Sequence, residues 1–106
     1  MMLAAKALAE MSGTFLLIFV GGSSILLSEK YPHFFPSFGV AVTFGSVICL
    51  MILALGHISG AHFNPAVTLA FAVAKRFPAA QIWLYWASQC AGGILGAGAL
   101  LLLRRV

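Results

Sequence analysis

Charged residues are scarce in this chain of 106 residues: Lys, Arg, Asp and Glu together make up 8% of it, whereas 62% is hydrophobic. A soluble domain carries about 25% charged residues, so this chain cannot cover a surface that faces water. Its six basic residues are scattered rather than gathered into the stripe that nucleic-acid binding requires. The composition predicts a membrane protein that contacts the lipid bilayer and binds no nucleic acid.

Cysteine is also scarce. The chain has two, Cys49 and Cys90, and each stands singly inside an apolar run. This spacing excludes a disulfide framework and a CxxC metal site, so we expect no metal and no cofactor. No short apolar stretch leads through a cleavage-like site into a soluble domain, and we therefore expect no removable signal peptide.

Long apolar runs fill most of the chain. A helix that crosses a bilayer needs about 20 mainly apolar residues, and the segments at about residues 4–27, 37–55 and 79–103 meet this requirement. Charged or proline-containing stretches separate them and predict connections. The predicted fold class is an all-α membrane protein with three transmembrane helices and one shorter piece between the second and the third.

The shorter piece, at about residues 56–74, is apolar, but the break at Gly56–Gly60 and the Asn64-Pro65 pair interrupt it, so it does not form a further span. Asn64 is a favourable N-cap residue, and Pro65 suits the first helical position. The roughly ten helical residues that follow would extend about 15 Å, half a bilayer. We expect a re-entrant loop with a half-helix, since irregular backbone at membrane depth must be buried in protein or line a watery cavity. An interfacial amphipathic helix is the alternative, disfavoured because residues 31–74 carry no Lys, Arg, Asp or Glu.

Three motifs of this chain resemble those of aquaporins. Gly56–Thr68 closely resembles the first pore loop of that family, including its Asn-Pro-Ala signature at Asn64, Pro65 and Ala66. Residues 9–14 are similar to the first-helix motif, and residues 85–93 to the third-helix motif. The order and spacing match over essentially the whole chain. Residues 1–106 are therefore expected to form a single aquaporin-like half-repeat, similar to the first half of a bacterial water channel.

The resemblance implies a pore made from two half-sized chains, because an aquaporin resembles two such units in tandem, inverted in the membrane. Three spans place three basic residues on either side of the membrane. These are Lys6, Lys75 and Arg76 on one side and Lys30, Arg104 and Arg105 on the other. Orientation follows Lys and Arg asymmetry, so neither direction is preferred. We expect an antiparallel homodimer with dual topology, or a higher homo-oligomer.

The family implies roles for residues of the loop. Asn64 would cap the half-helix and donate from its amide to permeating water. The backbone carbonyls of Gly60, Ala61, His62 and Phe63 would line the pore as hydrogen-bond acceptors. Glu10, the carboxylate within a span, would support the loop together with His57. A constriction would combine Phe44 of one chain with Ile52, Ala61 and Val67 of the other.

The implied function is a passive channel for water, and for small neutral solutes such as glycerol, in a bacterial inner membrane. No side chain is expected to perform covalent chemistry, so the protein is not predicted to be an enzyme. The alternatives are a proton-coupled small transporter that uses Glu10, an inactive gene fragment, or a subunit that needs a different second-half partner. Gly92 and Gly96 form a small-xxx-small pair that could pack within one chain or between chains.

Overall fold

The computed structural model describes residues 2–105 as helices joined by short connections. The elements are α1 (Leu3–Lys30), α2 (Ser37–Ser59), α3 (Pro65–Val73), the 3-10 turn η1 (Ala79–Gln81) and α4 (Ile82–Arg104). Within this described range, α1, α2 and the segment Ala79–Arg104 are long and apolar enough to cross a membrane. The nine residues of α3 are too few to cross. The predicted fold class is confirmed.

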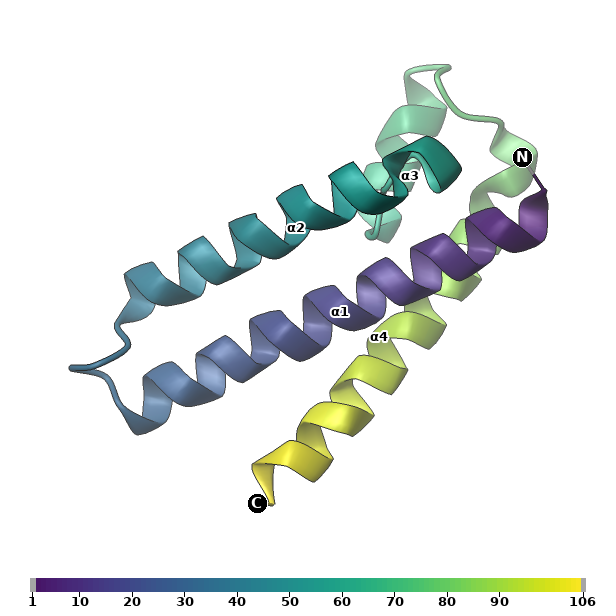
Figure 1. The fold of residues 1–106 in the computed structure, drawn as a ribbon. Coiled ribbons are helices and arrows are strands. Elements are labelled where there is room, and N and C mark those ends of the chain that lie inside the picture. The colour runs from purple at the N-terminus through teal and green to yellow at the C-terminus, as the bar shows by residue number, and fades with distance from the viewer. Residues whose placement is uncertain (1, 106) are drawn as a thin grey trace.

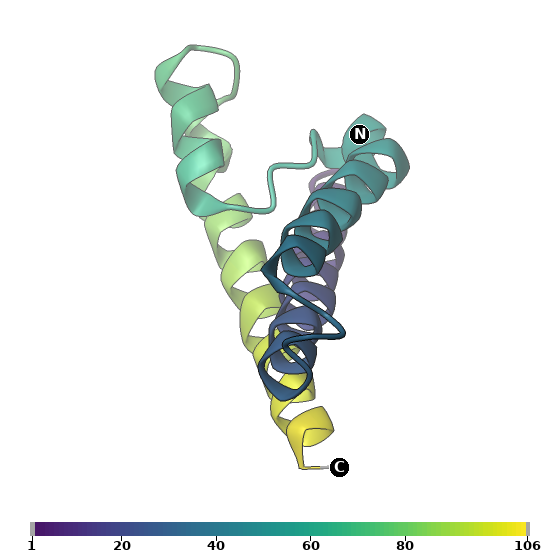
Figure 2. The same cartoon turned by 90° about the vertical axis from the view of Figure 1, so that its left-hand side faces the viewer.

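The helices are arranged so that α3 returns toward the end of the bundle where α2 finishes. α1 and α2 form an antiparallel pair, and α4 crosses α1 at an angle (Figure 1). In Figure 2, the segment after α2 crosses the bundle before α3 begins, and α3 then runs back beside the first turns of α4. The chain therefore enters and leaves this region from the same end.

Two glycines of α4 bring its backbone close to that of α1. A Cβ atom at Gly92 would overlap the carbonyl oxygen of Met11, and one at Gly96 would lie 2.9 Å from the carbonyl oxygen of Phe15. Small residues permit such close approach between membrane helices. In this structure, the small-xxx-small pair of α4 therefore packs against α1 of the same chain.

Both α1 and α2 continue beyond the apolar segments expected from the sequence. α1 includes the polar residues up to Lys30, because a helix need not stop where its apolar run stops. α2 was expected to end near residue 55, but it continues through Gly56 to Ser59. The helix ends at Gly60, whose φ of 88° is left-handed and whose N–H donates to the carbonyl oxygen of Gly56 at 2.9 Å. Glycine adopts this geometry at little cost.

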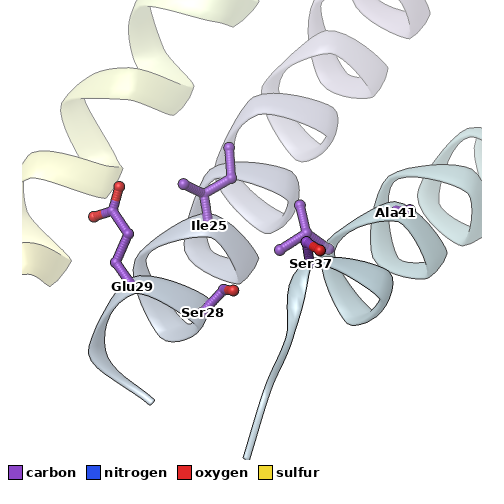
Figure 3. Close-up of a pocket in the computed structure, with 6 residues that line it drawn as sticks. Ile25, Ser28, Glu29, Ser37 and Ala41 are labelled. Carbon is purple, nitrogen blue, oxygen red and sulfur yellow. The ribbon is translucent and has the colours of Figure 1, made fainter. Parts of the chain in front are cut away.

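A shallow depression lies between α1 and α2 at the end of the bundle far from α3. The residues that line it are Ile25, Ser28, Glu29, Ser37, Val40 and Ala41. We call it the α1–α2 hollow. Figure 3 shows the Glu29 side chain pointing away from Ser37. None of the residues predicted for the pore loop lines this hollow.

Candidate functional site

The carboxylate of Glu10 on α1 is fully buried and accepts four hydrogen bonds. Oε1 accepts from the backbone N–H of Phe63 and from Nε2 of Gln89, both at 2.8 Å. Oε2 accepts from the hydroxyl of Ser59 at 2.6 Å and from the backbone N–H of His62 at 3.1 Å. A buried carboxylate needs donors that replace its lost hydration, and here each oxygen has two. Glu10 thereby joins α1 to α4 and to the segment after α2.

The loop of residues 60–64 has an uncommon backbone conformation. Ala61 and Phe63 both have a φ of 54°, a left-handed conformation that costs a residue with a side chain roughly 1–2 kcal/mol. Such strain persists only where the surroundings enforce it. Successive backbone N–H groups of the loop are bound by side chains: Ala61 donates to Oγ of Ser59 at 3.1 Å, and the next two donate to the carboxylate. The loop shape is therefore imposed by its acceptors.

The Phe63 side chain is 4% exposed, and a glycine of α1 makes room for it. A Cβ atom at Gly13 would overlap the Phe63 ring. Gly13 follows Glu10 by three positions, so the two residues share one face of α1. On that face, the Glu10 carboxylate accepts from the Phe63 N–H, and Gly13 leaves room for the Phe63 ring.

Two residues of α4 complete the support of the loop. Tyr85 and Gln89 are four positions apart, so they share a helix face, and they are 1% and 2% exposed. The Tyr85 hydroxyl donates to the carbonyl oxygen of Ser59 at 2.6 Å. Besides its bond to the carboxylate, Nε2 of Gln89 donates to Oγ1 of Thr68 at 2.9 Å. Nδ1 of His62 lies 2.9 Å from the same oxygen, so α3 is tied into the network.

α3 begins with a capped first turn. Asn64 has an extended backbone, with a φ of −159°, and its Oδ1 accepts from the backbone N–H of Ala66 at 2.8 Å. Pro65 occupies the first helical position, where no N–H is needed, and its carbonyl oxygen accepts from Nε1 of Trp86 at 3.1 Å. Oδ1 is engaged in the cap, whereas the Nδ2 group of Asn64 keeps its two N–H donors available.

A hollow of about 370 Å³ lies against the loop, and we call it the loop hollow. Its wall combines loop residues Gly60, Ala61, His62, Phe63 and Asn64 with the side chains of Leu17, Ile48, Ile52, Val67 and Phe71. Within residues 2–105, the carbonyl oxygens of residues 60–63 accept no hydrogen bond. The hollow is therefore lined both by loop residues with free backbone acceptors and by apolar side chains.

The structure separates some of the remaining predicted site residues from this hollow. Ile52, Ala61 and Val67 line it, whereas Phe44 does not; a Cβ at Gly21 would overlap the Phe44 ring, which therefore packs on α1. The expected constriction is thus not assembled within one chain.

His57, expected to support the loop, is exposed, and its ring makes no hydrogen bond to the loop in the described part of the chain. Ser59, two positions later, makes those contacts instead.

No role for Ser59, Thr68, Tyr85 or Gln89 follows from the sequence patterns described above. A signal for the last two was present, because a Tyr and a Gln stand four positions apart in the uncharged run of residues 79–103. Buried polar side chains in a membrane helix commonly bond to another helix. Among residues 2–105, no group of three or more His, Cys, Asp or Glu side chains is placed to hold a metal ion.

Fold and site together define a class of membrane protein: three spanning helices, with a half-helix whose capped start is held by a buried carboxylate. The family described as Major intrinsic protein matches residues 1–105. The chain is 45% identical over 98 residues to "Nodulin-26" of Glycine max, covering 92% of this chain and 36% of that protein. It is 46% identical over 98 residues to "Aquaporin NIP1-1" of Oryza sativa subsp. japonica, covering 92% and 34%. The chain belongs to the major intrinsic protein family, which confirms the predicted resemblance.

The chain spans about a third of the length of the curated relatives it matches. A third relative, "Aquaporin NIP3-1" of Arabidopsis thaliana, is 45% identical over 98 residues, which cover 92% of this chain and 30% of that protein. These relatives come from plants, so they do not support the expected bacterial inner membrane. An integral membrane location agrees with the family and with the three apolar helices.

Proposed function

We propose that this chain supplies one half of a passive transmembrane channel for water and for small neutral solutes such as glycerol. The observation that carries the proposal is the loop hollow, which is lined by Asn64, by apolar side chains and by loop residues whose carbonyl oxygens accept no hydrogen bond within the described residues. No covalent chemistry is required of any of these groups, so the proposed protein is not an enzyme.

The backbone of the loop would replace hydrogen bonds that water loses on entering a narrow apolar passage. The loop N–H groups are turned to Glu10 and Ser59, which leaves the carbonyls as acceptors for the permeant. The amide of Asn64 would donate to it at the start of α3. The N-terminus of a helix carries a partial positive charge, so this position disfavours cations.

The pore would be completed by a second copy of this chain in the opposite orientation. The two copies would place two Asn64 residues together near the midplane, as inverted repeats do. Phe44 of one copy would then meet Ile52, Ala61 and Val67 of the other, which accounts for the separation of Phe44 from these residues within one chain. The three basic residues toward each end of this segment favour neither orientation.

The alternative of a proton-coupled transporter is disfavoured by the surroundings of Glu10. A coupling carboxylate must exchange its proton with a substrate pathway, whereas Glu10 is fully buried and both oxygens are occupied by protein donors. Its geometry suits a structural acceptor. A channel's flux should also be unaffected by a pH gradient.

Liposomes that contain this chain alone test the proposal. Liposomes loaded with sucrose should swell fast when they are diluted into a hypo-osmotic buffer. They should also swell measurably when the external sucrose is replaced by iso-osmotic glycerol. Both rates should be independent of a pH gradient. Val67→Arg should lower glycerol flux more than water flux, because it narrows an apolar mouth and adds a charge. Val67→Leu is the control for added volume alone. Swelling no faster than that of empty liposomes would contradict a channel formed by this chain.

The orientation of the copies is tested separately in intact cells. A variant with Leu103→Cys, in a background with Cys49→Ser and Cys90→Ser, preserves every basic residue. An impermeant thiol reagent should label about half of the molecules before the cells are opened, because both orientations are populated. Labelling that is complete or absent would show a single orientation and would favour a different second-half partner.

A further inference from the structure

A second depression, at the end of the bundle far from the loop hollow, lies between the last turns of α1 and α4. We call it the α1–α4 hollow; its volume is about 400 Å³. Its apolar lining comes from Leu26, Leu27 and Leu103, and its polar lining includes Lys30, Tyr31 and Arg104. Lys30 and Arg104 are the last residues of their helices, so the basic groups lie toward the bundle end. The hollow is therefore amphipathic along the direction of the spans.

The charge of this hollow is positive. Among the described residues that line it there is no carboxylate. Glu29, the acidic neighbour of Lys30 in sequence, is among the residues that line the separate α1–α2 hollow, and its side chain points away from Ser37 (Figure 3). Nζ of Lys30 lies 5.6 Å from the centroid of the Tyr31 ring, within the range of a cation–π contact. Both residues line the hollow.

We propose that the α1–α4 hollow binds an anionic phospholipid. The headgroup phosphate would lie between Lys30 and Arg104, since guanidinium groups bind phosphate through paired hydrogen bonds. One acyl chain would lie along the leucines, where α1 and α4 diverge. Tyr31 is 48% exposed and has the amphipathic character that favours the membrane interface, the depth at which a lipid headgroup lies. The proposal rests on the membrane-spanning fold and does not depend on channel activity.

The contrast with the α1–α2 hollow supports a lipid of negative charge. Both depressions lie at the same end of the bundle and both are largely apolar, but the α1–α2 hollow has a carboxylate and no basic residue among its lining groups. Basic residues near a membrane surface attract anionic lipids. The α1–α4 hollow has two such residues on adjacent helices.

Native mass spectrometry of the purified chain, titrated with phosphatidylglycerol or phosphatidylcholine, tests the proposal. Wild type should bind the first phosphatidylglycerol at least tenfold more tightly than phosphatidylcholine. The double variant Lys30→Gln, Arg104→Gln should lose most of that preference. The matched control, Lys75→Gln with Arg76→Gln, removes the same charge from the other end and should keep it.

The outcomes separate a lipid site from general charge attraction and from a free-anion site. Equal losses in the two double variants, or no preference in wild type, would overturn the proposal. Displacement of phosphatidylglycerol by millimolar glycerol phosphate would show that the anion alone is recognised, and would also overturn it. Because the readout is lipid binding, these results are independent of whether liposomes swell.

Discussion

The two sides of this molecule differ in which side chains they bury. Along α1 and α4, the buried residues are mostly small or polar, such as Gly13, Gly92 and Gln89. Along α2, only Val47 and Ser59 are buried, and large apolar side chains such as Leu53, at 75% exposure, face outward. In lipid, burial of apolar surface gives little driving force, so helices associate through close packing and hydrogen bonds. The α1–α4 side thus supports the loop, whereas α2 and α3 expose large apolar side chains, which a second half-unit would cover in the proposed channel.

The strongest test of this contrast is a large side chain at the α1–α4 contact. Gly92→Leu should destabilise the fold by about 3 kcal/mol, because the Cβ alone overlaps a backbone carbonyl that cannot move aside. The measurement is the unfolding free energy in mixed micelles. Gly98→Leu, on the same helix but with nothing within 4 Å of its Cβ position, should be tolerated. Equal effects of the two variants would break the comparison.

Removal of the buried acceptor should have the next largest effect. Glu10→Ala leaves two loop N–H groups, the Ser59 hydroxyl and the Gln89 amide without their partner. Each unsatisfied donor costs about 1–3 kcal/mol, so the folded loop should be lost even where the helices remain. Hydrogen exchange of the His62 and Phe63 amides reports this directly.

The matched control for this change is Glu29→Ala, because Glu29 is exposed and lies on the same helix. It should change the unfolding free energy by less than about 0.5 kcal/mol. Slow exchange of the loop amides in Glu10→Ala would show that the loop holds its shape without the carboxylate.

Loss of the cap of α3 should destabilise the fold less than loss of the Glu10 carboxylate does. Asn64→Ala removes one hydrogen bond to Ala66 and should cost about 1 kcal/mol. If the proposed channel is correct, the same variant should reduce water permeability several-fold, because the amide donor is lost from the hollow. Asn64→Asp retains the capping oxygen but not the amide, so it should restore stability without restoring flux. Normal flux in either variant would remove Asn64 from the proposed pathway.

The helices could be predicted from the sequence because their signals are local. Runs of apolar residues set the three spans, and Asn64-Pro65 marks the start of the half-helix. The end of α2 lies later than the sequence predicts, at Ser59 rather than near residue 55. Gly56 and Gly60 have the same intrinsic tendency to end a helix, and only the left-handed backbone at Gly60 shows which of them does so.

The contacts of the site could not be predicted in the same way, because they join distant parts of the chain. Glu10 and Gln89 are 79 positions apart, and no periodicity within a single helix relates them. The left-handed conformations of Ala61 and Phe63 contradict the intrinsic preference of these residues, so they appear only when the surrounding acceptors are known. His57 was expected to support the loop, but Ser59 makes this contact. The helix continues to Ser59, whose hydroxyl donates to the Glu10 carboxylate.

The support of the loop also implies an order of events during biosynthesis. The loop leaves the ribosome before α4, yet Tyr85 and Gln89 of α4 supply two of its hydrogen-bonding groups. A nascent chain that has inserted only α1 and α2 therefore lacks part of the framework that compensates the strain at Ala61 and Phe63. The full set of hydrogen bonds around the loop therefore exists only once α4 is in place, so we expect the loop to reach its final shape after the last span has inserted.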